Sequence, residues 1–97
     1  MNLLAEIDGI AVPLAKCDWV LWGPCGCPFG VTVGATPTGS IVQPQEEDAW
    51  KAFYDYKREI VRARRDGCRV ELMTHERYCA EVLPGMRTGC PHGKAAS

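Results

Sequence analysis

The sequence has no excess of charge of either sign, because 11 lysines and arginines stand against 12 aspartates and glutamates, a formal net charge of −1. A chain so close to neutral has no overall field that would draw it to nucleic acid or to anionic lipid. It also has no run approaching the roughly 18 apolar residues of a membrane span. The sequence therefore predicts a protein that does not enter a membrane.

Basic residues are missing from positions 1–15, where a signal peptide would carry its positive charge. This apolar stretch instead contains Glu6 and Asp8 and is interrupted by Gly9 and Pro13. We therefore expect no export and a cytoplasmic location. In a reducing compartment, the six cysteines would serve as metal ligands or small core residues more often than as disulfides.

The length limits how much core the chain can build. With 97 residues and 46% hydrophobic content, residues 1–97 suffice for one domain, but a domain of this size buries its surface incompletely. We find no internal repeat, linker or low-complexity tract. The sequence predicts one domain of modest stability, which a metal ion would strengthen.

The first third of the chain has the pattern of strands. Alternating apolar residues flank Asp8-Gly9, the dipeptide that favours a tight type I′ hairpin turn. A third strand is expected over residues 17–22, with both faces at least partly covered. Residues 23–28 form a turn, and residues 29–33 return antiparallel to the third strand.

One long helix is expected over residues 46–66, with acidic residues at its start and arginines at its end before Gly67. Its apolar stripe, predicted to lie on the sheet, consists of Trp50, Phe53, Tyr54, Ile60 and Val61. A short strand follows at 69–73, and Thr74 caps a short helix that ends near residue 83, before Pro84 and Gly85. The predicted fold is α+β: a small antiparallel sheet of hairpins, packed by one long and one short helix and stapled by zinc.

Two short pairs of metal-binding side chains carry the zinc prediction. Cys25-Gly26-Cys27 lies at the expected hairpin tip, and Cys90-Pro91-His92 lies near the end of the chain. Zinc takes four such ligands in a tetrahedron, commonly as two local pairs. We therefore predict a structural zinc held by Cys25, Cys27, Cys90 and His92, although an iron–sulfur cluster also uses thiolates.

A competing pair of ligands lies in the second helix. His75 and Cys79 are four residues apart, so they point the same way and could replace one of the tail ligands. The segment from 75 to 79 differs at one position from the HExxH helix of zinc proteases, and a cysteine there changes that site. Neither a protease nor a zinc deaminase is supported. We expect no enzyme and no small-molecule substrate, and we expect His75 to make a local hydrogen bond.

The remaining cysteines, Cys17, Cys68 and Cys79, are most simply small buried residues. Among the other candidate contact residues, Trp19 and Trp22 precede the expected hairpin tip. We expect at least two of Trp19, Trp22 and Trp50 to pack in the core, and one exposed beside the tip would anchor an interface. Arg62 and Arg65 complement the end of the long helix and could also meet phosphate.

Several short motifs together resemble small uncharacterised proteins of actinobacterial bacteriophages. They are Trp-x-x-Trp, Cys-Gly-Cys-Pro-Phe-Gly, a helix ending in arginines and glycine, Val-Glu-Leu-Met-Thr-His and Gly-Cys-Pro-His, which span residues 17–92. The resemblance implies a phage accessory protein in the bacterial cytoplasm. The leading expectation is a zinc-stabilised module that binds a host or phage protein, and the alternative is a small nucleic-acid-binding regulator.

Overall fold

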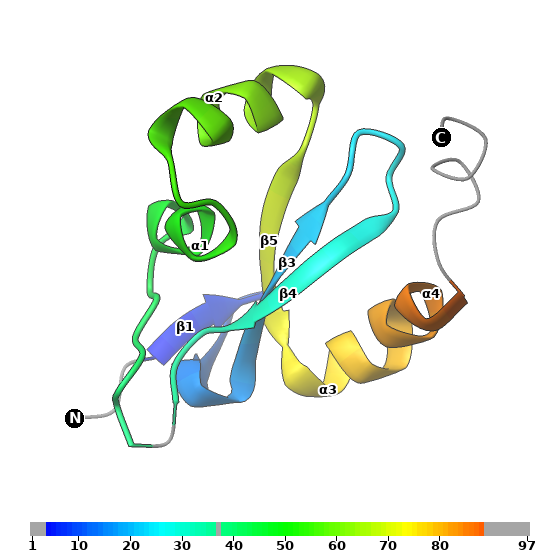
Figure 1. The fold of residues 1–97 in the computed structure, drawn as a ribbon. Coiled ribbons are helices and arrows are strands. Elements are labelled where there is room, and N and C mark those ends of the chain that lie inside the picture. The colour runs from blue at the N-terminus through cyan, green and yellow to red at the C-terminus, as the bar shows by residue number, and fades with distance from the viewer. Residues whose placement is uncertain (1–3, 37, 89–97) are drawn as a thin grey trace.

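The computed structural model describes residues 4–36 and 38–88. Its elements, in chain order, are β1 (Leu4–Ile7), β2 (Ile10–Pro13), the 3₁₀ turn η1 (Leu14–Lys16), β3 (Cys17–Trp22), β4 (Pro28–Val33), α1 (Glu46–Phe53), α2 (Lys57–Asp66), β5 (Arg69–Thr74), α3 (His75–Arg77), the π-helical segment η2 (Tyr78–Val82) and α4 (Leu83–Thr88). Within the described residues the strands form two antiparallel sheets, so the predicted small α+β fold is confirmed in outline (Figure 1).

The first hairpin, β1–β2, forms as its turn sequence predicts. Asp8 and Gly9 both have positive φ, 54° and 80°, as a type I′ turn requires. Register follows from this turn, with Ile7 opposite Ile10 and Ala5 opposite Val12. The hairpin packs its inner side against Leu14 and Cys17 in a small cluster at the start of β3.

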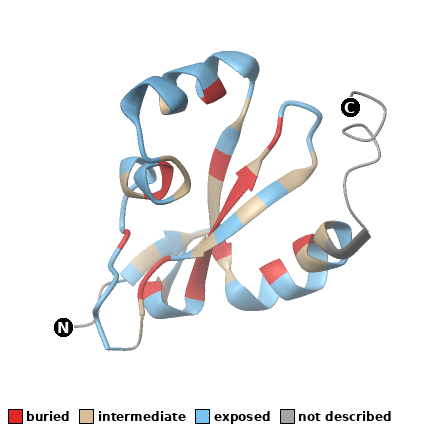
Figure 2. Cartoon of the chain, viewed as in Figure 1, coloured by how far each residue is buried: buried red, intermediate tan, exposed pale blue. Residues whose placement is uncertain are grey.

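The main sheet has three strands in the order β4-β3-β5, and β3 is antiparallel to both neighbours. Residues 17–21 of β3 are all buried (Figure 2). This confirms that the strand is covered on both faces, as its largely apolar sequence indicates. Alternation sends Trp19 and Leu21 to one face and Val20 and Trp22 to the other.

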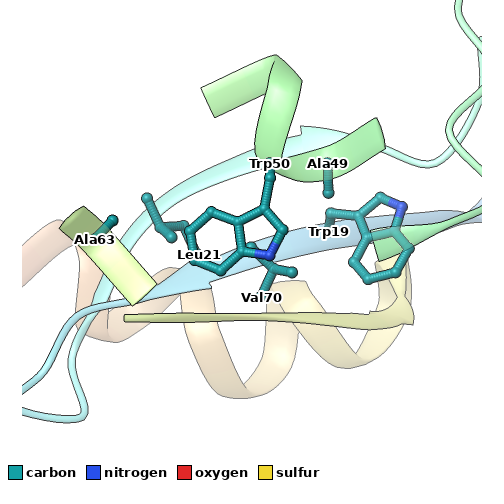
Figure 3. Packing of buried hydrophobic residues seen from close by; sticks show 6 residues of the cluster. All are labelled: Trp19, Leu21, Ala49, Trp50, Ala63 and Val70. Carbon is teal, nitrogen blue, oxygen red and sulfur yellow. The ribbon is translucent and has the colours of Figure 1, made fainter. Parts of the chain in front are cut away.

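Helices α1 and α2 cover the first face. Trp50 reaches down from α1 onto Leu21 and Val70, and Ala63 closes the cluster from α2 (Figure 3). A fully buried side chain of this kind contributes about 1.5–3 kcal/mol through removal of apolar surface from water. Val61, which the apolar stripe placed inward, is instead 49% exposed.

The single long helix expected over residues 46–66 is wrong, because it is broken into α1 and α2. Tyr54 and Tyr56 have extended backbone, with φ of −132° and −121°. One unbroken helix over that stretch would run about 31 Å, whereas six-residue strands reach only about 20 Å. The break allows α2 to change direction and still pack Ile60 and Ala63 on the same cluster.

The second face is covered by α3, η2 and α4, which follow one another without a gap. The Thr74 hydroxyl accepts a hydrogen bond from the Arg77 amide at 3.2 Å, so the predicted cap is confirmed. Val20, Met73, Tyr78 and Val82 form the core here. α3, η2 and α4 form one continuous helical segment, which follows α1 and α2 in the described chain.

The expected helix end near residue 83 is wrong, since α4 continues through Pro84 and Gly85 to Thr88. The Leu83 amide bonds to the Tyr78 carbonyl, five residues back. Such a widened π turn lets a helix continue into a proline, which has no amide hydrogen and would otherwise clash with the preceding turn.

Over residues 4–36 and 38–88, no helix is both long and apolar enough to cross a membrane.

Candidate functional site

The cysteine pair predicted as the firmer half of the metal site lies at the tip of the β3–β4 hairpin. The Gly23 amide bonds to the Cys27 carbonyl at 2.8 Å, and the Gly26 amide bonds to the Gly23 carbonyl at 3.0 Å. Gly26 has φ of +86°, a conformation that side chains rarely adopt. This turn leaves Cys25 exposed and Cys27 half-buried.

Cys68 lies beside this tip, although the sequence indicated only a buried core residue. Gly67 ends α2 in the left-handed conformation, and a Cβ built on it would lie 3.6 Å from Cβ of Pro24. Burial, followed by the charges of Asp66 and Cys25, raises the pKa of the half-buried Cys68 thiol. The signal that was missed is topological, since pairing of β5 with β3 brings residue 68 to the hairpin.

The other two predicted ligands, Cys90 and His92, lie outside the described residues. Within residues 4–36 and 38–88, no group of three or more His, Cys, Asp or Glu side chains is arranged to hold a metal. The zinc site therefore stays a prediction that depends on the tail pair.

His75 and Cys79 lie far from the hairpin tip. Trp22 pairs with Arg69 at one end of the sheet, and Cys17 pairs with Thr74 at the other. The two ends are five residue steps apart along the strand, about 17 Å, whereas zinc–sulfur bonds are about 2.3 Å long. The geometry argues against His75 as a replacement ligand beside Cys25 and Cys27.

His75 instead joins two side chains of its own end of the sheet. Its Nδ1 lies 2.6 Å from Oδ2 of Asp18, and its Nε2 lies 3.4 Å from Sγ of Cys79. His75 thus makes the expected local hydrogen bond, with Cys79 four residues along the chain, and a second one with Asp18, which is 57 positions away in sequence. Cys79 is exposed rather than buried, while Cys17 is buried as predicted.

Asp18 was not recognised from the sequence as a candidate site residue. It is a carboxylate in a strand whose residues 17–21 are all buried, and it is only 5% exposed. Buried charges are normally paired, so an aspartate at an inward position of an apolar strand was the available signal. The partner itself could be found only from the pairing of β3 with β5.

The tryptophans do not provide the exposed anchor that the sequence allowed. Trp19 is 6% exposed and donates its Nε1 hydrogen to the Gln43 carbonyl at 2.7 Å. Trp22 is half-buried, donates to Glu71 at 3.1 Å and is covered by Arg69. Trp19 therefore belongs to the core, as expected for at least two of the tryptophans, and its role as an interaction residue stays a prediction.

Arg62 and Arg65 are exposed on the outer side of α2, where they line a shallow hollow with Tyr56 and Val61. The helix carries five basic residues against two acidic ones, hence a net charge of +3, in a chain whose net charge is −1. Tyr56 is 59% exposed and has the Arg58 guanidinium 5.4 Å from its ring centre. This surface, the α2 face, is the most basic part of the described chain.

A second exposed surface lies along β4, an edge strand of the main sheet among the described elements. Its sequence, Pro-Phe-Gly-Val-Thr-Val, has no charge, and Phe29, Val31 and Val33 are 51%, 38% and 39% exposed. The Gly34 amide donates to the Cys17 carbonyl at 2.8 Å, so the peptide groups of Gly34 face β3. Because successive residues of a strand alternate in this respect, the amide and carbonyl of Val31, three residues earlier, point away from β3. We call Phe29, Val31 and the outward peptide groups of Val31 the β4 edge.

No protein-family model matches this chain, and neither a curated protein nor a solved structure matches it.

Proposed function

We propose that this protein is a zinc-stabilised interaction module that binds a partner protein by pairing the β4 edge with an extended segment of that partner. The observation that carries the proposal is an uncharged edge strand with two large apolar side chains exposed, Phe29 and Val31. Edge strands normally carry charges, prolines or covers that prevent pairing. An edge left open and apolar favours strand addition.

The open part of the edge is short and well defined. Gln43 donates its side-chain amide to the Val33 carbonyl at 2.8 Å, which occupies the far end of the strand. Among residues 4–36 and 38–88, no strand pairs with the outer side of the region from Phe29 to Val31, which is where we place the partner. Alternate side chains of the added segment would meet Phe29 and Val31, so we expect that segment to be apolar at every second position.

Structural zinc completes the proposal at the adjacent hairpin tip. Gly26 holds Cys25 and Cys27 on a tight turn at the start of β4, and thiolates in such a turn suit zinc. Cys90 and His92 would supply the other two ligands. The role we assign to the metal is to fix the hairpin that carries the β4 edge.

The setting follows the resemblance to bacteriophage proteins. We propose that the partner is a host or phage protein met in the bacterial cytoplasm. In this account the protein is not an enzyme, because it acts by binding.

Val31→Pro tests the strand-addition proposal directly. The Val31 amide points away from β3, so proline removes a donor from the β4 edge without removing a hydrogen bond of the β3–β4 ladder. Val31→Thr, which keeps the amide, is the matched control. In pull-downs from bacterial lysate, we expect a specific protein to be retained by the wild type and by Val31→Thr and lost with Val31→Pro.

The same result must hold with the captured protein purified. A binding constant that is unchanged by Val31→Pro, in a variant whose circular dichroism matches the wild type, would contradict strand addition. Recovery of no specific protein would count against the interaction module as a whole.

The alternative function is nucleic-acid binding through the α2 face. Its support is the +3 charge of the helix and the exposed Tyr56 beside Arg58, because basic side chains with an aromatic ring suit phosphates and bases. At low salt, Arg62→Ala with Arg65→Ala should weaken binding to mixed DNA and RNA and flatten its salt dependence. Lys16→Ala, a basic residue outside α2, is the control. Undetectable binding at low salt excludes this alternative.

A further inference from the structure

Asp18, His75 and Cys79 form a continuous hydrogen-bonded chain, which we call the Asp–His–Cys chain. An ionised carboxylate only accepts hydrogen bonds, so at 2.6 Å the His75 Nδ1 must be the donor to Asp18. The neutral ring then has its lone pair on Nε2. In this neutral tautomer the Cys79 thiol, 3.4 Å away, is the donor to Nε2. This order directs the thiol proton toward a base.

Each member of the chain is positioned by a different part of the fold. Asp18 is fixed in the central strand β3 and is buried. His75 starts the helical run that follows β5 and is 63% exposed. Cys79 lies one turn later in η2 and is exposed. A buried carboxylate thus orients an accessible imidazole beside an accessible thiol.

We propose that Cys79 is a reactive thiol that exchanges with small-molecule disulfides, with His75 as its base and Asp18 as the positioning residue. In this step the Cys79 thiol gives its proton to His75 Nε2, and the thiolate attacks one sulfur of the disulfide. A new sulfur–sulfur bond forms to Cys79 as the original one breaks. The leaving thiolate takes the proton from His75, so a mixed disulfide and one free thiol result.

The geometry favours disulfides over acyl substrates. Acyl transfer also needs hydrogen-bond donors aimed at the developing oxyanion. Two amides close to Cys79 are already used, since the Tyr78 amide bonds to the His75 carbonyl and the Arg77 amide bonds to the Thr74 hydroxyl. Thiol–disulfide exchange needs only an accessible thiolate and a proton relay.

Other described cysteines differ in environment. Cys17 is buried, and its Sγ donates to the Pro13 carbonyl at 3.5 Å. Burial raises the pKa of both the Cys17 and the Cys68 thiols, which disfavours their thiolates at neutral pH. They serve as slow reference sites within the same chain.

Oxidised glutathione is the probe, with the full chain and with the adduct located by peptide mass spectrometry. The key variant is His75→Asn, whose side-chain amide can still donate to Asp18 but cannot act as a base. Glu76→Gln, a change at the neighbouring helical residue outside the Asp–His–Cys chain, is the matched control. The rate at Cys79 is also measured for the same chain unfolded in urea.

We expect Cys79 in the folded wild type to form the adduct about tenfold faster than in urea, because a neighbouring base raises the thiolate fraction. His75→Asn should remove that advantage, and Glu76→Gln should retain it. Asp18→Asn should lower the rate while Cys79 stays exposed, a change that a merely structural aspartate would not produce.

A Cys79 rate no faster in the folded wild type than in urea would overturn the proposal, and this comparison requires no variant to fold. Equal rates in wild type and folded His75→Asn would also overturn it. Neither result would bear on the β4 edge, which lies on a different strand.

Discussion

The two ends of the main sheet carry cysteines in opposite settings. At one end, Cys25 and Cys27 lie on a glycine-containing hairpin tip whose proposed zinc site depends on the tail. At the other end, Cys79 is joined through His75 to a buried carboxylate within the described chain. In our proposals the same residue type thus serves the fold at one end of the sheet and chemistry at the other. The difference lies in which side chains the fold brings beside each cysteine.

Metal removal should give the largest difference between the two ends. Structural zinc contributes an apparent ~10–16 kcal/mol in small domains, so a strong chelator should unfold the chain. Circular dichroism melting would show this, with recovery on adding zinc. Cys27→Ser should reproduce the loss, whereas Cys79→Ser should melt like the wild type. A fold that survives the chelator would show that no metal stabilises the hairpin-tip end, so the two ends would not differ in this respect.

Gly67→Ala should destabilise the hairpin-tip end by about 1–2 kcal/mol, because φ of +102° is a left-handed conformation. Gly85→Ala is the matched control, since this glycine lies in α4, where the change should be neutral or stabilise by up to about 1 kcal/mol. Urea unfolding measures both. Equal effects of the two substitutions would show that the turn at Gly67 is not strained by a side chain.

Thr74→Ala should destabilise the opposite end by about 1 kcal/mol, because the Arg77 amide loses its cap. Thr74→Ser keeps the hydroxyl and should retain the free energy of unfolding. The loss of the cap should also loosen His75, the next residue, and slow adduct formation at Cys79. An unchanged rate of adduct formation at Cys79 in Thr74→Ala would show that the Thr74 cap does not help to position His75.

Alkaline pH should give the smallest effect. Burial, followed by the Asp18 charge, raises the pKa of the Cys17 thiol above its ordinary value of 9.0. The unfolded chain therefore loses this proton first, and the free energy of unfolding falls as pH rises through and above 9. Cys17→Ala should make that decline shallower between pH 8 and 10, as followed by urea unfolding. The same decline in wild type and Cys17→Ala would show that Cys17 does not contribute to the pH dependence of the free energy of unfolding.

Local signals in the sequence predicted much of the fold. Asp8-Gly9 fixes the first hairpin, alternation identifies β3, and Thr74 caps the helical run at its start. The break at Tyr54–Tyr56 was missed, because it is set by the length of the sheet that α1 and α2 must cover. Helical periodicity alone continues straight through it.

The candidate sites were less predictable for the same reason. Cys25 and Cys27 are visible as a pair because they are two residues apart. The contact between Asp18 and His75 spans 57 positions and arises only from the register of β3 with β5. Which of the tryptophans is buried was equally hard to predict, because the burial of Trp19 depends on α1 and on Gln43, both distant in sequence.

Native mass spectrometry of the full chain tests the central claim, a zinc held at the hairpin-tip end. The account predicts one zinc per wild-type chain, lost in Cys27→Ser and in His92→Ala and retained in Cys79→Ser and His75→Asn. Stoichiometric metal in both Cys27→Ser and His92→Ala would contradict it, as would a zinc lost only when Cys79 or His75 is changed.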